Sequence, residues 1–333
     1  MCQVIKTAWY EEHDQKFRQV RTDNCKMAKT VVFVLLMVIS LSFLWIAKVQ
    51  GKTSFIVLGD WGYNSSHQAK VAKAMGEWAE ANNARFVLTV GDNFYNEGVS
   101  SLTDPLWNTL YRDVYVDPSL NITWYACLGN HDHYWGNAIY QVKAHQTMDW
   151  RWYMPNLYYT FEVQDHEGDQ VTIEFIVADT ENCKSKMQMK WMKKAITRSS
   201  ADWTIAVGHH PVLSSGKHGG TPTMYSSSSY RKAMEEEKVA FYFSGHDHSL
   251  EHISHGTRPT EYVISGSGSK LYDRSEESLQ DVVDKGYTSE FFESTPGFVG
   301  VTIHNNVANV TFVDKGGNVI YWFLKENPRA ATI

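Results

Sequence analysis

The residues of this chain that could do chemistry stand at five similar places, where an apolar run ends in glycine and a metal-binding side chain follows directly. The pairs are Gly59-Asp60, Gly91-Asp92, Gly129-Asn130, Gly208-His209 and Gly245-His246, the last extended by Asp247-His248. An apolar run closed by glycine is typical of a buried strand that ends at a turn. Since the carboxyl ends of strands in an open sheet share one edge, five such ligands can converge on one metal centre.

The donor set narrows the kind of metal site. It offers oxygen and nitrogen but no thiolate, which excludes an iron–sulfur cluster and a structural cysteine zinc site. Its members are Asp60, Asp92, Asn130, His209, His246 and His248. They are too many for one ion, but they suit two ions about 3.5–4 Å apart that share a carboxylate, an arrangement used in phosphoryl hydrolysis. We assign Asp92 as the bridging carboxylate.

The strands and helices that must position these side chains can be predicted from the same alternation of apolar runs and turn residues. Strands are predicted near 54–58, 86–90, 123–128, 172–178, 203–207 and 239–243, and helices near 67–82, 105–115, 137–148, 186–198 and 229–237. Later strands near 261–265, 298–304, 307–313 and 319–324 have no predicted helix between them. This pattern predicts an α/β (or α+β) four-layer sandwich, two mixed β-sheets flanked by α-helices, in one catalytic domain over residues 52–333.

The motifs resemble those of a known superfamily. Gly59-Asp60-Trp61-Gly62, Gly91-Asp92-Asn93-Phe94-Tyr95, Gly129-Asn130-His131-Asp132-His133, Gly208-His209-His210-Pro211-Val212 and Gly245-His246-Asp247-His248 look like the ordered motif set of the metallophosphoesterases. Tyr95, three residues after Asp92, resembles the mark of the purple acid phosphatases, and the likeness is greatest to the small mammalian tartrate-resistant type. It runs from about Thr53 to Leu324 and implies the metallophosphoesterase fold.

The resemblance implies a binuclear centre. Asp60, Asp92, Tyr95 and His248 would hold Fe(III), while Asp92, Asn130, His209 and His246 would hold a divalent ion, either Fe, Zn or Mn. The chemistry of Tyr95 agrees independently, because a phenol with a pKa near 10 becomes a ligand only when a hard, highly charged ion displaces its proton.

The expected reaction is hydrolysis of phosphate monoesters by in-line attack of a metal-bound hydroxide. His131 follows the ligand Asn130, and His218 stands nine residues after His209, the spacing of a second active-site histidine in the family. Either could protonate the leaving group. Substrates would be small phosphate monoesters or phosphoproteins. Three alternatives stay open: a phosphodiesterase or nucleotidase with the same ligands, radical chemistry at an iron pair, and a non-catalytic, metal-stabilised surface protein.

Three departures from the mammalian pattern stand out. The stretch between Asp179-Thr180 and Gly208-His209 lacks room for the exposed loop that represses the mammalian enzymes, so proteolytic activation is not expected. The cysteine that would pair with Cys183 is missing, and with Cys127 in a predicted strand we expect no disulfide. His210 replaces a tyrosine beside the ligand His209, with no consequence predicted.

The amino end carries an apolar run at 30–47, after Lys29. It predicts that residues 1–51 are an upstream extension followed by a signal peptide, and that the protein is secreted or lysosomal. The alternative is a retained single-pass membrane anchor with an extracytosolic catalytic domain. Asn64, Asn121 and Asn309 begin glycosylation sequons.

Residues 52–333 contain 24 Lys and Arg against 33 Asp and Glu, a formal charge of −9, so nucleic-acid binding is not expected. The lysines at 186, 190, 193 and 194 are predicted to form a solvated helix face, and the protein is expected to be a monomer.

Overall fold

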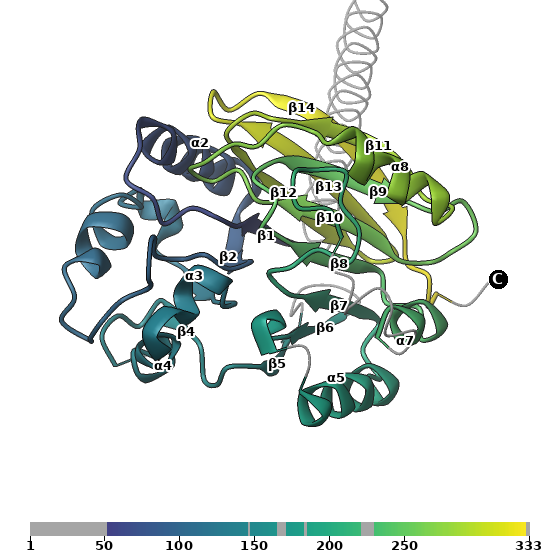
Figure 1. Cartoon of the computed structure of the whole chain (residues 1–333), viewed down its shortest axis with the longest axis horizontal. Coiled ribbons are helices and arrows are strands. Elements are labelled where there is room, and N and C mark those ends of the chain that lie inside the picture. The colour runs from purple at the N-terminus through teal and green to yellow at the C-terminus, as the bar shows by residue number, and fades with distance from the viewer. Residues whose placement is uncertain (1–51, 146, 165–170, 183–184, 221–229, 331–333) are drawn as a thin grey trace, which may run out of the picture. The chain divides into compact units, whose positions relative to one another are not determined.

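Two mixed β-sheets pack against each other in the described part of the chain (Figure 1). The structure is a computed structural model, and it describes residues 52–145, 147–164, 171–182, 185–220 and 230–330. Within these residues each sheet has seven strands. The prediction of a metallophosphoesterase-type sandwich of two mixed sheets with flanking helices is confirmed.

The first sheet has the order β14-β13-β12-β1-β2-β3-β4. Its strands are β1 (Lys52–Leu58), β2 (Ala84–Thr89), β3 (Thr123–Tyr125), β4 (Trp152–Tyr153), β12 (Gly297–His304), β13 (Val307–Asp314) and β14 (Val319–Glu326). Strands β1 to β4 run parallel, while β12 to β14 join through antiparallel pairs. The carboxyl ends of β1, β2 and β3 therefore meet at one edge.

The second sheet has the order β11-β9-β10-β8-β7-β6-β5. Its strands are β5 (Tyr159–Gln164), β6 (Thr172–Val177), β7 (Trp203–Val207), β8 (Phe241–Ser244), β9 (Leu250–Ser254), β10 (Glu261–Ser265) and β11 (Thr288–Glu293). Strands β6, β7, β8 and β10 run parallel. The ends of β7 and β8 thus form a second edge beside the first.

Helices cover the outer faces of both sheets (Figure 1). Helix α2 (Ser66–Asn82) packs on β1 and β12, and α5 (Lys186–Arg198) packs on β6 beside α7 (Tyr230–Glu236). Helix α8 (Glu276–Asp284) contacts β11. Shorter helical segments are η1 (Trp107–Arg112), η2 (Pro118–Leu120), α3 (Asn130–His133), η3 (Tyr134–Gly136), α4 (Ala138–Lys143) and η4 (Thr180–Asn182).

Aromatic rings fill the space between the sheets. Phe55 of β1 stacks on Phe86 of β2 with ring centroids 4.9 Å apart, and it meets Phe175 of β6 edge to face at 5.4 Å. Phe175 in turn stacks on Phe161 of β5 at 4.6 Å. Each such pair adds about 0.5–1.5 kcal/mol beyond the burial of its area. These contacts hold the two sheets together and so hold the two edges side by side.

Several predicted elements differ from the structure. The expectation of no helix after 261–265 is wrong, because α8 lies between β10 and β11. The predicted helices at 105–115 and 137–148 shorten to η1 and α4, and the predicted strand at 123–128 ends at Tyr125. Strands β4, β5, β9 and β11 were not predicted. Helix α5 has the predicted bounds.

The amino-terminal prediction concerns residues that the structure leaves undescribed. Residues Gly51–Ile333 form one compact unit. Within the described part of this unit, no helix is both long and apolar enough to cross a membrane. The apolar run at 30–47 lies outside the described residues, as does Cys183.

Candidate metal centre

The five strand ends predicted to carry ligands come together where the two sheets adjoin. Asp60, Asp92 and Asn130 follow β1, β2 and the segment after β3, whereas His209 and His246 follow β7 and β8. Hydrogen bonds join the two edges: the Gly59 N–H donates to the Ser265 carbonyl at 2.7 Å, and the His246 N–H donates to Asp60 Oδ2 at 2.9 Å. The sequence predicted that all five ligands lie at the edge of one open sheet, but in the structure they come from the adjoining edges of two sheets.

The glycine before each ligand is required mainly by close packing. A Cβ on Gly129 would lie 2.1 Å from Asp92 Oδ1, and one on Gly245 would lie 2.4 Å from Asp60 Oδ2. Left-handed backbone occurs at Gly91, which has a φ angle of 95°, and at three of the candidate ligands: Asp60, Asp92 and His246 have φ angles of 56°, 51° and 69°. Non-glycine residues in this left-handed region cost of order 1–3 kcal/mol and persist where the surrounding structure holds them, commonly at functional sites.

One group of donor atoms comes from Asp60, Tyr95 and His248. Tyr95 Oη lies 3.0 Å from Asp60 Oδ1 and 3.1 Å from His248 Nε2, and the latter two atoms lie 3.2 Å apart. All three residues are buried. The three atoms form a nearly equilateral triangle.

A second group of donor atoms comes from Asn130, His209 and His246. Asn130 Oδ1 lies 3.1 Å from His209 Nε2 and 3.2 Å from His246 Nδ1, and the two ring nitrogens lie 3.3 Å apart. His209 Nδ1 donates to the Val90 carbonyl at 2.9 Å, which leaves Nε2 with a lone pair toward the group.

Asp92 adjoins both groups. Its Oδ1 lies 3.5 Å from His209 Nε2, and a carboxylate oxygen of Asp92 lies within 4.8 Å of ligand atoms of Asp60 and His248. The His131 N–H donates to Asp92 Oδ1 at 3.0 Å and holds the carboxylate in place.

These spacings fit metal ions. Ligands about 2.1 Å from an ion and at right angles lie about 3.0 Å from each other. The donor atoms within the two groups lie 3.0–3.3 Å apart. At 3.1 Å, the lone pairs of His209 Nε2 and Asn130 Oδ1 face each other with no proton between them in the tautomer fixed by Val90. A cation makes such an arrangement favourable.

The charges lead to the same conclusion. Asp60 and Asp92 are 0% and 1% exposed, and burial together with the charge of Asp92 raises the pKa of Asp60 well above its ordinary range. Burial, Asp60 and Asp92 likewise raise the pKa of Tyr95. Two buried carboxylates without a counter-charge would be strongly destabilising, and a bound cation supplies that charge. Burial lowers the pKa of His248 to about 3, which keeps its imidazole neutral, as a ligand must be.

A buried carboxylate supports the first sheet's ligand loops. Asp132 accepts hydrogen bonds from the backbone N–H groups of Asn93, Phe94 and Gly129 at 2.9–3.1 Å, and from the Gln141 side chain at 2.7 Å. It thereby joins the loop after β2 to the loop after β3. Asp132 lies within the third motif, where no role was predicted for it; its place two residues after the candidate ligand Asn130 was the available signal.

The two candidate acid histidines lie at the border of the donor groups. His131 Nδ1 contacts the Asn96 carbonyl at 2.5 Å, and its Nε2 lies 4.0 Å from Asp92 Oδ2. The exposed His218 has its ring centroid 4.7 Å from that of His246, and its backbone N–H donates to Asp247 Oδ1 at 2.8 Å. The structure therefore places both histidines beside the donor groups, and their catalytic role stays a prediction.

A further pair of histidines, not assigned from the sequence, lies beside the second donor group. His210 contacts Thr180 Oγ1 through Nδ1 at 2.9 Å, and its ring centroid lies 4.4 Å from that of His246. His133 Nε2 lies 2.9 Å from Asp179 Oδ1. Burial opposes protonation of His133, but the hydrogen bond and charge of Asp179 prevail and raise its pKa.

A basic and aromatic rim lies next to the first donor group. Tyr272 stacks on His248 with ring centroids 4.1 Å apart, and Lys217 Nζ lies 4.1 Å from the Tyr272 ring centroid. A pocket of about 440 Å³ is lined by Lys217, Leu271, Tyr272, Asp273, Arg274 and Ser275.

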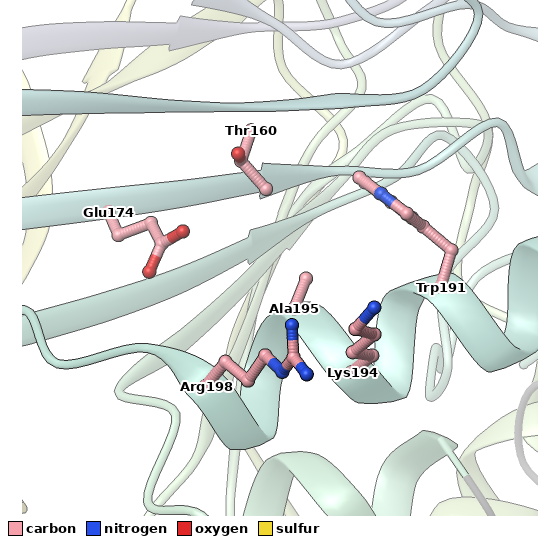
Figure 2. A pocket seen from close by; sticks show the side chains of 6 residues that line it. All are labelled: Thr160, Glu174, Trp191, Lys194, Ala195 and Arg198. Atoms are coloured by element: carbon pink, nitrogen blue, oxygen red, sulfur yellow. The ribbon is translucent and has the colours of Figure 1, made fainter.

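A separate pocket of about 260 Å³ lies between α5 and strands β5 and β6 (Figure 2). Trp191, Lys194 and Arg198 of α5 face Thr160 and Glu174 of the strands. No predicted ligand lines this pocket. The lysines at 186, 190 and 194 are exposed and Lys193 is partly exposed, in agreement with a solvated helix face.

Asn64, Asn121 and Asn309 are exposed, and their glycosylation stays a prediction. Cys127 is buried and free.

Comparisons with known proteins agree over this part of the chain. A profile of the calcineurin-like phosphoesterase family matches residues 53–250. Purple acid phosphatase 7 of Arabidopsis thaliana is 32% identical over 82% of this chain and 86% of its own length, and tartrate-resistant acid phosphatase type 5 of Sus scrofa is 30% identical over 80% and 85%. Plant and mammalian relatives are therefore similar to it to nearly the same degree.

The fold has solved counterparts. GAP50, described as the anchor in the inner membrane complex of Plasmodium, superposes with a TM-score of 0.72 and 26% identity, covering 84% of this chain and 90% of that one. Family profile, relatives and fold match the region that holds both donor groups. The chain thus belongs to the purple acid phosphatase family of calcineurin-like phosphoesterases and is a metal-dependent phosphatase.

Proposed function

We propose that this protein is an acid phosphatase that hydrolyses phosphate monoesters at a binuclear centre of Fe(III) and a divalent ion, either Fe, Zn or Mn. The observation that carries the proposal is the pair of donor triangles with Asp92 adjoining both. In this proposal Asp60, Asp92, Tyr95 and His248 bind Fe(III), and Asp92, Asn130, His209 and His246 bind the divalent ion.

Tyr95 is the residue that favours iron over two zinc or magnesium ions. Burial and two neighbouring carboxylates hold its pKa well above the ordinary value, so the phenol keeps its proton unless a hard, highly charged ion displaces it. Fe(III) supplies that charge more strongly than a divalent ion does. Iron binding at this site should therefore release the phenolic proton.

The protein groups around the centre supply orientation and protons. When bound, the metal pair would neutralise phosphate charge and lower the pKa of a coordinated water. The contact of His131 Nδ1 with the Asn96 carbonyl directs Nε2 toward the centre, where it can bind a phosphate oxygen or protonate a leaving alkoxide. His218 can do the same from the side of His246. Both remain candidates for the general acid.

A cysteine nucleophile is not required and finds no support in the described residues. Cys127 is buried, and burial with the charges of Asp179 and Asp132 raises the pKa of its thiol well above the ordinary value. A thiol in that setting is unreactive. Cys127 is therefore not a candidate nucleophile.

The proposed setting is a secreted or lysosomal monomer acting on small phosphate monoesters or phosphoproteins. Membrane attachment would follow only if residues 30–47 are retained as an anchor. The likeness to GAP50 favours one rival function, an anchoring protein that keeps the fold without turnover. Enzyme activity separates the two.

The test is hydrolysis by the purified, metal-loaded protein of a monoester, p-nitrophenyl phosphate, and a diester, bis(p-nitrophenyl) phosphate, across acidic and alkaline pH. We expect monoester hydrolysis with a mildly acidic optimum. Faster diester hydrolysis would favour the phosphodiesterase alternative, and an alkaline optimum would contradict an acid phosphatase. No hydrolysis of either ester by protein that contains both metals would favour the anchoring role.

A further inference from the structure

A lysine ammonium lies against the face of the candidate iron-binding tyrosine. Lys270 Nζ is 3.8 Å from the ring centroid of Tyr95 and 4.6 Å from that of Tyr63. The two rings meet edge to face with centroids 6.2 Å apart. Cations this close to aromatic rings are attracted by the negative face of the ring, the more strongly when partly withdrawn from water, and Lys270 is half-buried.

Backbone and hydroxyl contacts fix the loop that carries Lys270. The Gly268 N–H donates to the Gly59 carbonyl at 3.1 Å, and the Ser269 hydroxyl donates to the Asp60 carbonyl at 2.6 Å. The Ser65 hydroxyl, from the residue that caps α2, donates to the Ser269 carbonyl at 3.1 Å. The loop after β10 is therefore fastened to the loop that carries the ligand Asp60, and Lys270 is held in a defined position.

We propose that Lys270 is a positioning residue that tunes the bond between Tyr95 and iron, shifting the visible absorption to shorter wavelength and making Fe(III) easier to reduce. This inference rests on the proposed function, because it needs Tyr95 to bind Fe(III) as tyrosinate.

The direction follows from electrostatics. In the visible transition of an iron tyrosinate, an electron leaves the ring and moves to the metal. A positive charge against the ring face stabilises the electron while it is on the ring, so excitation requires more energy. The same charge makes the tyrosinate a weaker electron donor to Fe(III) and stabilises the added electron of Fe(II). The charge of Lys270 therefore raises both the energy of the visible transition and the reduction potential of Fe(III).

The chain offers a matched control. Lys217 Nζ lies 4.1 Å from the ring of Tyr272, which stacks on the candidate ligand His248 but is not itself a candidate ligand. Lys217 is therefore also a cation near the centre, over a tyrosine that does not donate to iron. Comparison of the two lysines separates the effect of a cation against the ring of Tyr95 from the effect of a cation elsewhere near the centre.

The experiment compares the metal-loaded wild type with Lys270→Met, Lys270→Arg and Lys217→Met. Iron content, the wavelength of the visible band and the rate of bleaching by ascorbate are measured for each. We expect Lys270→Met to absorb at longer wavelength and to bleach more slowly, while Lys270→Arg and Lys217→Met stay near the wild type. Equal wavelengths for Lys270→Met and wild type at equal iron content would overturn the proposal, and so would an equal shift in Lys217→Met.

Loss of iron is also informative. If Lys270→Met and a second neutral variant, Lys270→Gln, both lose iron while Lys270→Arg keeps it, the charge supports the iron tyrosinate and the proposal stands. Equal loss from all three would assign Lys270 a purely steric role and overturn it. A colourless wild type would instead refute the proposed iron tyrosinate itself, a failure that is distinct from an unshifted band.

Discussion

Replacing Glu251 by glutamine should stabilise the protein at alkaline pH and leave its stability almost unchanged at acidic pH. Glu251 lies in β9, is 0% exposed, and accepts hydrogen bonds from the hydroxyls of Ser215 and Ser289 and from the Ser215 N–H. These donors favour the charged carboxylate. Burial is the larger effect and raises the pKa of Glu251 from 4.5 to about 7.

The sign of the pH dependence follows from that rise. The folded protein keeps a proton on Glu251 that the unfolded chain releases above about pH 4.5, so stability is fully present below that pH and is lost as pH rises through about 7. A shift of about 2.5 pKa units corresponds to about 3 kcal/mol, most of it lost between about pH 5 and about pH 8. Glutamine has the shape of the protonated acid and cannot ionise.

Urea unfolding of wild type and Glu251→Gln at several pH values measures this difference. We expect nearly equal free energies of unfolding at about pH 5, and at about pH 8 a variant more stable by on the order of 2–3 kcal/mol. If the free energies of unfolding of the two proteins changed in parallel with pH, with the variant less stable at every pH, Glu251 would be charged in the folded protein. The serine hydrogen bonds would then outweigh burial, and the reasoning would be refuted.

Two further predictions concern the centre itself. Asp92→Asn should reduce metal content more than Asn130→Ala, because it removes charge between both donor groups while Asn130 is one neutral ligand; equal metal retention would contradict the bridging role. His131→Ala or His218→Ala should slow alkyl phosphates more than p-nitrophenyl phosphate, by up to about 10²–10⁴-fold for the true general acid, since the aryl leaving group needs little protonation. Uniform loss across leaving groups in both variants would make these histidines phosphate-positioning residues.

The clustering of the candidate ligands could be predicted from the sequence because the local pattern carries the information. A strand, a glycine and a donor recur, and the glycine is needed because a Cβ at Gly129 or Gly245 would collide with a neighbouring carboxylate. The sheet to which each strand belongs could not be predicted in this way. Strand pairing is decided by contacts between distant residues, such as Phe55 with Phe175.

Strand β9 and helix α8 were not predicted from the sequence, for reasons that their residues explain. Strand β9 was missed because Glu251 and His252 interrupt its apolar pattern, yet both are buried and paired, His252 with Glu261 at 3.1 Å. Helix α8 had a local signal, the cap residue Ser275 followed by two glutamates, but only Val282 is buried among its residues. A helix that buries so little gives a weak apolar pattern.

The surroundings of the centre depend on the fold rather than on motifs. Lys270 follows Tyr95 by more than half of the described chain, and only the fastening of the loop after β10 to the loop after β1 brings its ammonium to the tyrosine ring. Asp132 lies inside a recognised motif, but its hydrogen bonds to Asn93 and Phe94 appear only when β2 and β3 are neighbours.

The most direct test of the proposed iron–tyrosinate centre is metal analysis together with the visible spectrum of wild type and Tyr95→Phe. We expect about two metal ions per wild-type chain, one of them iron, and a visible charge-transfer band that Tyr95→Phe loses. The phenol oxygen lies 3.0 Å from Asp60 Oδ1 and 3.1 Å from His248 Nε2, so its loss removes one corner of the first donor triangle. A colourless wild type with two zinc ions and full activity would contradict an iron–tyrosinate centre.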